Sequence, residues 1–142
     1  MTPELIDYNN KDHHQKEWGQ EIWLVNTELY CGKVLIVNPM SRCSMHYHEK
    51  KDETFVVDAG RVFLEYYEEG THDIILLEQS MRIRIRPGVY HRFWSMEVST
   101  VYEFSTHHEE EDSYRMLDKL SGTFTLEQLN QVITECENET KE

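Results

Sequence analysis

The chain has 142 residues, which is enough for one domain and few for two. Twenty-seven Asp and Glu against fourteen Lys and Arg give a formal net charge of −13, which argues against general affinity for nucleic acids or for an anionic membrane surface. Hydrophobic residues make up 39% of the chain and gather in clusters, so we expect a folded globular domain. The eight histidines are the first indication that part of the acidic excess serves a cation.

The start of the chain and its cysteines favour a cytoplasmic protein. No apolar run reaches the roughly 18 residues of a membrane span, and no apolar stretch follows Met1 to act as a signal peptide. The three cysteines, Cys31, Cys43 and Cys136, are odd in number and lack a metal-type CxxC pairing. We therefore predict that they are small buried hydrophobes in a reduced compartment.

We predict one domain over residues 1–142, in three parts. Residues 1–17 form a polar N-terminal arm, residues 18–106 form a β-barrel, and residues 107–142 form an acidic segment and a helix. Apolar runs separated by Gly, Asn or Pro predict strands at 21–25, 33–38, 43–48, 54–58, 62–67, 74–77, 81–86, 90–94 and 100–105. Short strands at this spacing are typical of an all-β antiparallel sandwich or small barrel.

The tail has the pattern of a helix. Thr125 can cap its start, with Gln128 three residues later as the reciprocal partner. Apolar residues then recur at three- and four-residue steps, at Leu126, Leu129, Val132, Ile133 and Cys136. We expect one C-terminal α-helix that packs against the β unit or against a second subunit.

A group of potential metal ligands lies in the middle of the chain. His46 and His48 are two residues apart, so on a strand both side chains point to the same face. Glu53 follows after a short polar loop, and Gly60 stands where a hairpin needs positive φ. His91 begins a strand after a Pro-Gly turn. Three imidazoles and one carboxylate suit one divalent ion such as Mn, Fe, Ni, Co or Zn.

These two segments resemble the two motifs of the cupin superfamily. The first motif matches at its spacing, HxHx4Ex6G, except that Met40 stands at its opening glycine. In the second motif the glycine and histidine match, whereas Pro87 is one place late and Ser95 replaces a common asparagine. The resemblance implies a double-stranded β-helix, the jelly-roll barrel of cupins. It also implies a metal bound by His46, His48, Glu53 and His91.

A closer similarity is to the cupin domain of bacterial mannose-6-phosphate isomerases of the bifunctional guanylyltransferase type. That family has a Trp-Gly near its start, as at Trp18-Gly19, a lysine corresponding to Lys33, and a His-Arg pair corresponding to His91-Arg92. His46 stands where that family has glutamine, and the nucleotidyltransferase domain is absent. The resemblance implies sugar or sugar-phosphate chemistry.

An aldose–ketose isomerase moves a proton between adjacent sugar carbons, with a metal on the sugar oxygens and a nearby base. Glu103 is our candidate base, because it lies between Tyr102 and Phe104 in an apolar strand and can point into a barrel. The alternative is a solvent-facing residue on an outer strand. Glu65 has the same ambiguity.

Three basic residues are candidate substrate ligands, namely Lys33, Arg84 and Arg92. Arg84 lies in the alternating run from Arg82 to Arg86, which is either an anion site or a solvated sheet face. Lys51 is a similar case to Lys33: either could hold substrate, but an exposed side chain is the ordinary state of a lysine. Alternation aims Arg92 away from the metal ligands unless a bulge intervenes.

The leading hypothesis is a metal-dependent sugar or sugar-phosphate isomerase or epimerase with a small-molecule substrate. The alternatives are an Fe-dependent dioxygenase with the same ligands and a non-catalytic sugar-binding module. We expect a homodimer, because a small sandwich with an appended helix often pairs its edges. The other five histidines, His13, His14, His72, His107 and His108, are expected at the solvated surface.

Overall fold

The computed structural model describes residues 1–7, 9–116 and 121–140. Residues 8, 117–120 and 141–142, which belong to the predicted arm and acidic segment, lie outside the described residues. The elements in chain order are η1 (Asn10–Asp12), β1 (His13–Lys16), β2 (Gly19–Asn26), β3 (Cys31–Val37), β4 (Ser41–Arg42), β5 (His46–Tyr47), β6 (Glu53–Ala59), β7 (Val62–Glu68), β8 (Thr71–Leu77), β9 (Arg82–Ile85), β10 (Tyr90–Ser95), β11 (Ser99–Ser105), β12 (Tyr114–Arg115), β13 (Gly122–Thr123) and α1 (Leu126–Thr140).

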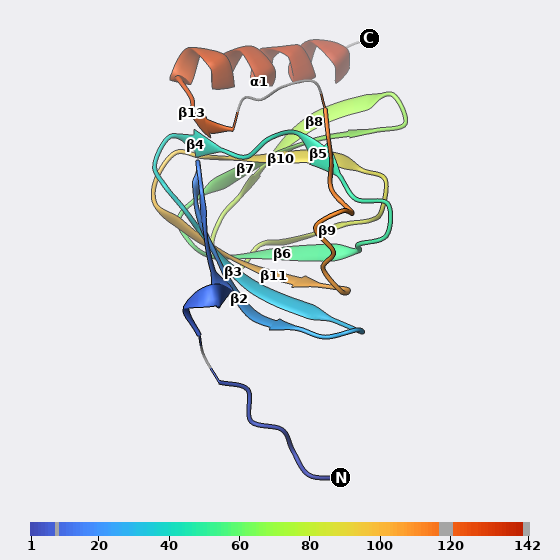
Figure 1. The fold of residues 1–142 in the computed structure, drawn as a ribbon. Helices are drawn as coiled ribbons and strands as arrows, with labels where there is room; N and C mark the ends of the chain where they lie inside the picture. Colours follow the sequence, from blue (N-terminus) through green and yellow to red (C-terminus); the bar gives the residue numbers. More distant parts are fainter. Residues whose placement is uncertain (8, 117–120, 141–142) are drawn as a thin grey trace.

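The strands form two sheets in which the described neighbours pair antiparallel (Figure 1). One sheet has the order β1-β2-β3-β11-β6-β9. The other has the order β12-β5-β10-β4-β13, with β7 on β10 and β8 on β7. This architecture confirms the predicted all-β barrel with a C-terminal helix.

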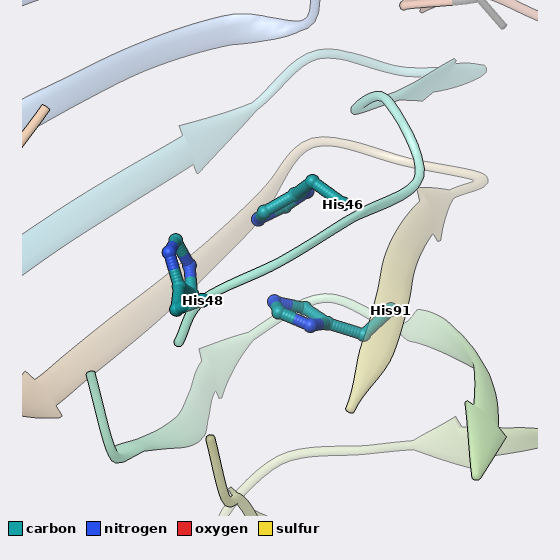
Figure 2. Close-up of side chains that lie close together, drawn as sticks. All are labelled: His46, His48 and His91. Carbon is teal, nitrogen blue, oxygen red and sulfur yellow. The ribbon is translucent and has the colours of Figure 1, made fainter. Parts of the chain in front are cut away.

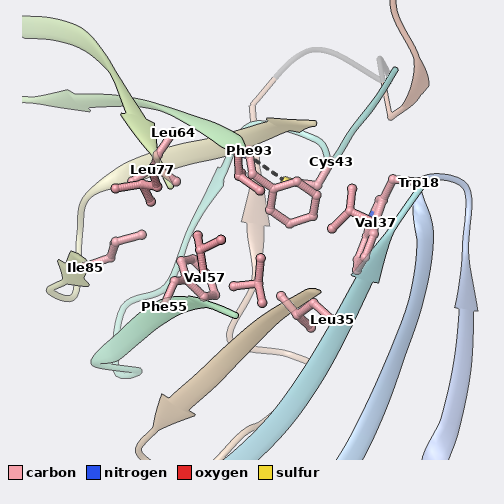
Figure 3. Close-up of a cluster of buried hydrophobic side chains, with 12 residues drawn as sticks. Trp18, Leu35, Val37, Cys43, Phe55, Val57, Leu64, Leu77, Ile85 and Phe93 are labelled. Atoms are coloured by element: carbon pink, nitrogen blue, oxygen red, sulfur yellow. Dashed lines mark hydrogen bonds between the residues drawn. The ribbon is translucent and has the colours of Figure 1, made fainter. Parts of the chain in front are cut away.

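The hydrophobic core lies between the two sheets (Figure 3). Alternate residues of β3 and β6 point inward, which follows from the two-residue period of a strand. The buried core side chains are Trp18, Leu35, Val37, Cys43, Phe55, Val57, Val62, Leu64, Leu77, Ile85, Phe93 and Val101. The same inward alternation on β11 carries Val101 into this core and Glu103 into a polar cavity beside it.

Two glycines are required by the backbone. Gly60 joins β6 to β7 with φ +85°, as the sequence predicted, and a Cβ there would clash with the side chain of Ser99. Gly19 starts β2 where it passes so close to Ile36 of β3 that a Cβ would overlap the carbonyl oxygen. The Trp18-Gly19 pair therefore has a packing role.

Helix α1 begins with the predicted capping box. The Thr125 Oγ1 accepts a hydrogen bond from the Gln128 N–H at 3.3 Å, and the Gln128 Oε1 accepts one from the Thr125 N–H at 2.9 Å. The helix packs on β8 of its own chain, with Leu129 and Cys136 buried. None of the described helices is long and apolar enough to cross a membrane.

The predicted strand 43–48 is wrong in extent, because within this range only the two residues of β5 form a strand, and β4 ends just before it. The Cys43 carbonyl accepts a hydrogen bond from the Arg92 Nε at 3.0 Å, a side-chain bond in place of a ladder bond. Within the predicted polar arm, residues 13–16 form strand β1, which pairs with β2. Cys31, Cys43 and Cys136 form no disulfide within the described residues and are buried, as predicted.

His72 was expected at the solvated surface, and this prediction is wrong. Its side chain is buried on β8, with Nε2 2.8 Å from the Glu65 Oε2. The Trp94 Nε1–H donates to the other oxygen of Glu65 at 3.0 Å. Both carboxylate oxygens of Glu65 therefore have a hydrogen-bonding partner in the protein, which explains how an ionisable residue is buried there.

Candidate metal centre and its cavity

Three histidines converge inside the barrel at one end of the sheets (Figure 2). His46 lies on β5 directly opposite His91 of β10, and His48 follows two residues after His46. One ring nitrogen from each lies within 4.8 Å of the others. The strand register and the two-residue period thus bring together the three imidazoles that the sequence singled out.

The Nδ1 atom of each ring faces a backbone carbonyl oxygen. The distances are 2.8 Å from His46 to Ser44, 2.5 Å from His48 to Asp112 and 2.9 Å from His91 to Val89. A carbonyl oxygen can only accept a hydrogen bond, so Nδ1 carries the proton in each ring. The Nε2 atoms are then left with lone pairs, which is the state that binds a metal.

The environment keeps at least two of these rings neutral. Burial, together with the nearby His91 and His48, holds the pKa of His46 well below its usual value. Burial also lowers the pKa of His48, against the opposing effect of Glu53. A metal therefore does not have to displace protons from these two rings at neutral pH.

Glu53 completes the group from the first position of β6. Its Oε1 lies 2.8 Å from the His91 Nε2 and 3.7 Å from the His48 Nε2, and its side chain is 2% exposed. Within the described residues, neither Glu53 Oε1 nor His91 Nε2 forms a hydrogen bond. Burial raises the pKa of Glu53, but its contacts with His91 and the charge on Lys51 outweigh this and hold it well below its usual range.

These buried atoms fit a divalent cation. A carboxylate oxygen and an imidazole lone pair repel each other at 2.8 Å unless a positive charge lies beside both. Two ligands that are each about 2.1 Å from one ion, at right angles, stand about 3 Å apart. The set of three nitrogens and one carboxylate oxygen suits borderline divalent metals.

Lys51 links Glu53 to Glu103. The Lys51 Nζ lies 3.3 Å from the Glu53 Oε2 and 3.0 Å from the Glu103 Oε2, and all three side chains are at least 94% buried. Glu103 thus points inward, and burial, together with the charge on Glu53, raises its pKa above its usual value. An exposed Lys51 was expected, and the 4% exposure shows that this was wrong.

Lys33 is also buried, contrary to the ordinary state of a lysine, with 2% of its side chain exposed. Its Nζ lies 3.1 Å from the Glu21 Oε1, 3.2 Å from the His108 Nδ1 and 4.6 Å from the centre of the Trp23 ring. These groups and the three converging histidines line one cavity of about 200 Å³. The predicted candidates His46, His48, Glu53, His91, Glu103 and Lys33 therefore share one site.

Two predicted substrate ligands lie elsewhere. Arg84 is exposed on β9 and forms an ion pair with Asp52 at 2.6 Å, which matches the solvated-face alternative. Arg92 is buried, donates to the Cys43 carbonyl and lies over the Trp94 ring at 5.6 Å. Neither lines the metal-centre cavity, because alternation on β9 and β10 turns both away from it.

Sequence reasoning missed the segment that closes this end of the site. Asp112 belongs to the predicted acidic segment, where an exposed side chain is the ordinary state, but it is 4% exposed. Its carboxylate accepts backbone N–H groups of residues 49, 50 and 51 at 2.9 to 3.3 Å. His107 and His108, also expected at the surface, are half-buried beside it. The continuous acidic run at residues 109–112 gave no signal of this packing.

No family model matches the chain, and no curated protein matches it. Several solved structures do. Oxalate decarboxylase from Bacillus subtilis, described with Mn(II) centres, superposes with a TM-score of 0.70 at 15% identity over 99% of this chain and 39% of its own. Capsular polysaccharide assembling protein CapF from Staphylococcus aureus gives 0.64 at 18% identity over 73% of this chain and 31% of its own.

KdgF from Halomonas sp. gives a TM-score of 0.57 at 16% identity, over 73% of this chain and 94% of that protein. The chain thus spans about a third of CapF and two fifths of oxalate decarboxylase, but nearly the whole of KdgF. At these identities the likeness concerns the fold. The mannose-6-phosphate isomerase resemblance stays a prediction. With two antiparallel sheets enclosing the histidine cluster, the chain has the double-stranded β-helix fold of the cupins.

Proposed function

We propose that the protein is a metal-dependent isomerase or epimerase that acts on a sugar or sugar phosphate. The observation that carries this proposal is the shared cavity. It holds a donor set for one divalent ion and, beside it, a buried carboxyl group of raised pKa on Glu103. A metal that polarises a substrate oxygen and a nearby base together suit the movement of a proton between adjacent carbons of a sugar.

The proposed ligands are the Nε2 atoms of His46, His48 and His91 and the Glu53 carboxylate. When bound, a divalent metal supplies Lewis-acid polarisation of a substrate oxygen. Mn, Fe, Co, Ni and Zn all suit this donor set. The Mn(II) centres of oxalate decarboxylase make Mn(II) the first ion to test.

Glu103 is the proposed base. In an isomerase it takes the proton from the hydroxyl-bearing carbon beside the substrate carbonyl and returns it to the former carbonyl carbon, while the hydroxyl proton passes to the former carbonyl oxygen. In an epimerase Glu103 removes the proton from one face only, and a second donor such as water supplies a proton to the opposite face. Its raised pKa suits this exchange, because the protonated and ionised forms then differ less in free energy at neutral pH. Lys51 and Ser105, each 3.0 Å from the Glu103 Oε2, hold the carboxyl group in place.

A carbohydrate substrate is supported by two observations. The cavity mixes aromatic side chains, among them Trp18 and Trp23, with polar groups that match the faces and hydroxyls of a sugar. CapF, one of the structural neighbours, is described as assembling capsular polysaccharide. Lys33 is the proposed substrate ligand that lines this cavity.

The metal assignment is tested by mass-spectrometric metal analysis of the purified protein. We expect about one divalent ion per chain and none in a His46→Ala, His48→Ala double variant. His72→Gln is the matched control, because this buried histidine lies outside the site and should leave the metal content unchanged. Retention of stoichiometric metal by the double variant would refute the assignment.

The reaction is tested by incubation of the metal-loaded protein with mannose 6-phosphate, and then with other aldoses and their phosphates, in deuterated water. We expect solvent deuterium on the carbon next to the carbonyl, and at least a hundredfold loss of exchange in Glu103→Gln. Glu110→Gln, a change to an exposed glutamate at the cavity rim, is the control. No exchange in any of these sugars by metal-loaded protein would contradict the proposal.

The same donor set also serves Fe-dependent dioxygenases among the cupins. Oxygen uptake that requires Fe(II) and disappears in His91→Ala would favour that function over sugar isomerisation. Sugar binding that Glu103→Gln leaves unchanged, without turnover, would favour a non-catalytic module. Either result would contradict the isomerase proposal and support the corresponding alternative instead.

We propose that the protein is a homodimer in the cytoplasm. A row of apolar side chains crosses the outer face of the first sheet, in the register Ile22–Val34–Tyr102–Val56. Phe104 lies on the same face of β11 and is 59% exposed. Light scattering should give twice the chain mass, and Phe104→Glu should shift it towards the monomer. A monomeric wild-type protein at micromolar concentration would overturn this proposal.

A further inference from the structure

His108 lies between two buried ammonium groups. The Nζ atoms of Lys33 and Lys51 are each 3.2 Å from the same ring nitrogen, Nδ1. The lysines reach it from β3 and from the loop before β6, so the contact joins two separate elements. An ammonium group can only donate, and therefore Nδ1 of His108 accepts from both and carries no proton. The proton of the neutral ring is then on Nε2.

The charges around His108 favour this neutral ring. Burial, together with the charges on Lys33 and Lys51, lowers its pKa to about 3, against opposing Glu21. Each lysine has its own carboxylate partner, with Glu21 beside Lys33 and Glu103 beside Lys51. The two ammonium groups therefore repel a second proton on the imidazole.

The position of the ring is fixed independently of any ligand. The His108 N–H donates to the Asn26 Oδ1 at 2.9 Å, and the Asn26 Nδ2 donates back to the His108 carbonyl at 3.1 Å. The Trp23 ring meets the imidazole edge-on, with the centroids 4.9 Å apart. These contacts pre-organise the side chain, so no ordering is needed when a ligand binds.

His108 is half-buried and lines the same cavity as the three metal-ligand histidines. Among the described residues, no hydrogen-bond acceptor is recorded for its Nε2. An N–H without an acceptor, on a ring that lines a cavity, is suited to an oxygen atom of a bound molecule. The Nδ1 atom is not available to a ligand in this way, because its lone pair already accepts from Lys33 and Lys51.

We propose that His108 is a substrate-binding residue that donates its Nε2–H to an oxygen of the bound substrate and takes no part in proton transfer. This inference rests on the proposed function, and it specifies that the substrate presents a hydroxyl, carbonyl or acidic oxygen beyond the atoms held at the metal centre. The assignment separates two roles within the cavity. Glu103 exchanges the proton, and His108 orients the substrate.

The first test needs no turnover. Long-range ¹H–¹⁵N NMR of ¹⁵N-histidine-labelled, Zn-loaded protein should show one ring that stays neutral with its proton on Nε2 from about pH 8 to about pH 5. The His108→Asn variant assigns this signal by its disappearance. A His108 ring that carries its proton on Nδ1, or that titrates near the ordinary pKa of about 6.5, overturns the inference.

The second test adds glycolate and then mannose 6-phosphate as oxygen-bearing probes. The His108 Nε2–H signal should shift on addition, and His108→Asn should weaken probe binding about tenfold in calorimetry, which is the loss of one hydrogen bond. His108→Gln, whose amide N–H₂ reaches the position of Nε2, should restore part of this affinity. No shift with either probe, or equal affinities of wild type and His108→Asn, overturns the binding role.

Activity data separate this inference from the proposed function. In the deuterium-exchange assay, His108→Asn should raise KM and leave kcat and the pH profile within about threefold of wild type. If His108→Asn removed one side of the pH dependence of kcat and left KM unchanged, His108 would be an acid or base, and the inference would be overturned. Absence of deuterium exchange in the wild-type protein would contradict the isomerase proposal but not the role of His108, because the NMR and calorimetric experiments test that role without turnover.

Discussion

Replacement of Asp112 by alanine should destabilise the loop that joins His48 to Glu53, two of the proposed metal ligands. Its carboxylate accepts three backbone N–H groups, at 2.9 Å from Glu49, 3.2 Å from Lys50 and 3.0 Å from Lys51. A hydrogen bond to a charged group contributes about 1.5–3 kcal/mol when it is buried. Only the Lys51 N–H is fully buried, and the other two can turn to water. We therefore expect a loss of about 2–4 kcal/mol, less than the whole stability of a typical domain.

The measurement is urea denaturation of metal-free protein at neutral pH. Glu111→Ala, a change to an exposed acid of the same run, is the control and should cost less than about 0.5 kcal/mol. The Asp112 side chain also fixes the position of its own backbone carbonyl, which accepts from the His48 Nδ1. Without that side chain the carbonyl can shift, so Asp112→Ala should weaken metal binding about 10- to 100-fold. Equal denaturation midpoints for Asp112→Ala and Glu111→Ala would refute the reasoning.

Three further predictions follow from the same structure. Gly60→Ala should lower the free energy of unfolding, measured by urea denaturation, by about 1–3 kcal/mol more than Gly70→Ala does. Both glycines have positive φ, but only at Gly60 would a Cβ clash, with Ser99. Equal losses in the two variants would contradict this. Mn(II) at a hundredfold excess over its Kd should stabilise the wild type by about 2.7 kcal/mol and leave His91→Ala unchanged, as thermal melts can check. Since the folded-state pKa of His46 is depressed, unfolding takes up a proton, and metal-free protein should lose stability as the pH falls below about 6.5. A flat stability profile between about pH 7.5 and pH 5 would contradict this last expectation.

The parts of the site that local periodicity controls were predictable from the sequence. The two-residue period of a strand places His46 and His48 on one face, and the same period turns Glu103 inward beside Val101. The capping box at Thr125 likewise needs only neighbouring residues. In each case the signal lies within a few positions of the chain.

The parts that depend on distant partners were not predictable. Lys51 is buried because Glu103, 52 residues away, supplies a carboxylate, and Asp112 is buried because backbone N–H groups more than 60 residues away need an acceptor. His108 meets Lys33 across 75 residues. A single sequence shows the polar character of these residues but not their partners, so each was assigned to solvent. Burial of a charge is decided by its partner and not by its own type.

The distribution of charge in the cavity bears on the proposal that a protein with a net charge of −13 binds a sugar phosphate. The ionic side chains that line it are balanced, four basic against four acidic: Lys16, Lys33, Lys51 and Arg115 against Glu21, Glu53, Glu103 and Glu110. The acidic excess therefore lies outside the cavity. With the buried rings of His46 and His48 neutral, a bound divalent ion would give this enclosed space a positive charge. An anionic oxygen, such as that of a sugar phosphate, would then be attracted locally, because charges beyond a Debye length of about 10 Å are largely screened.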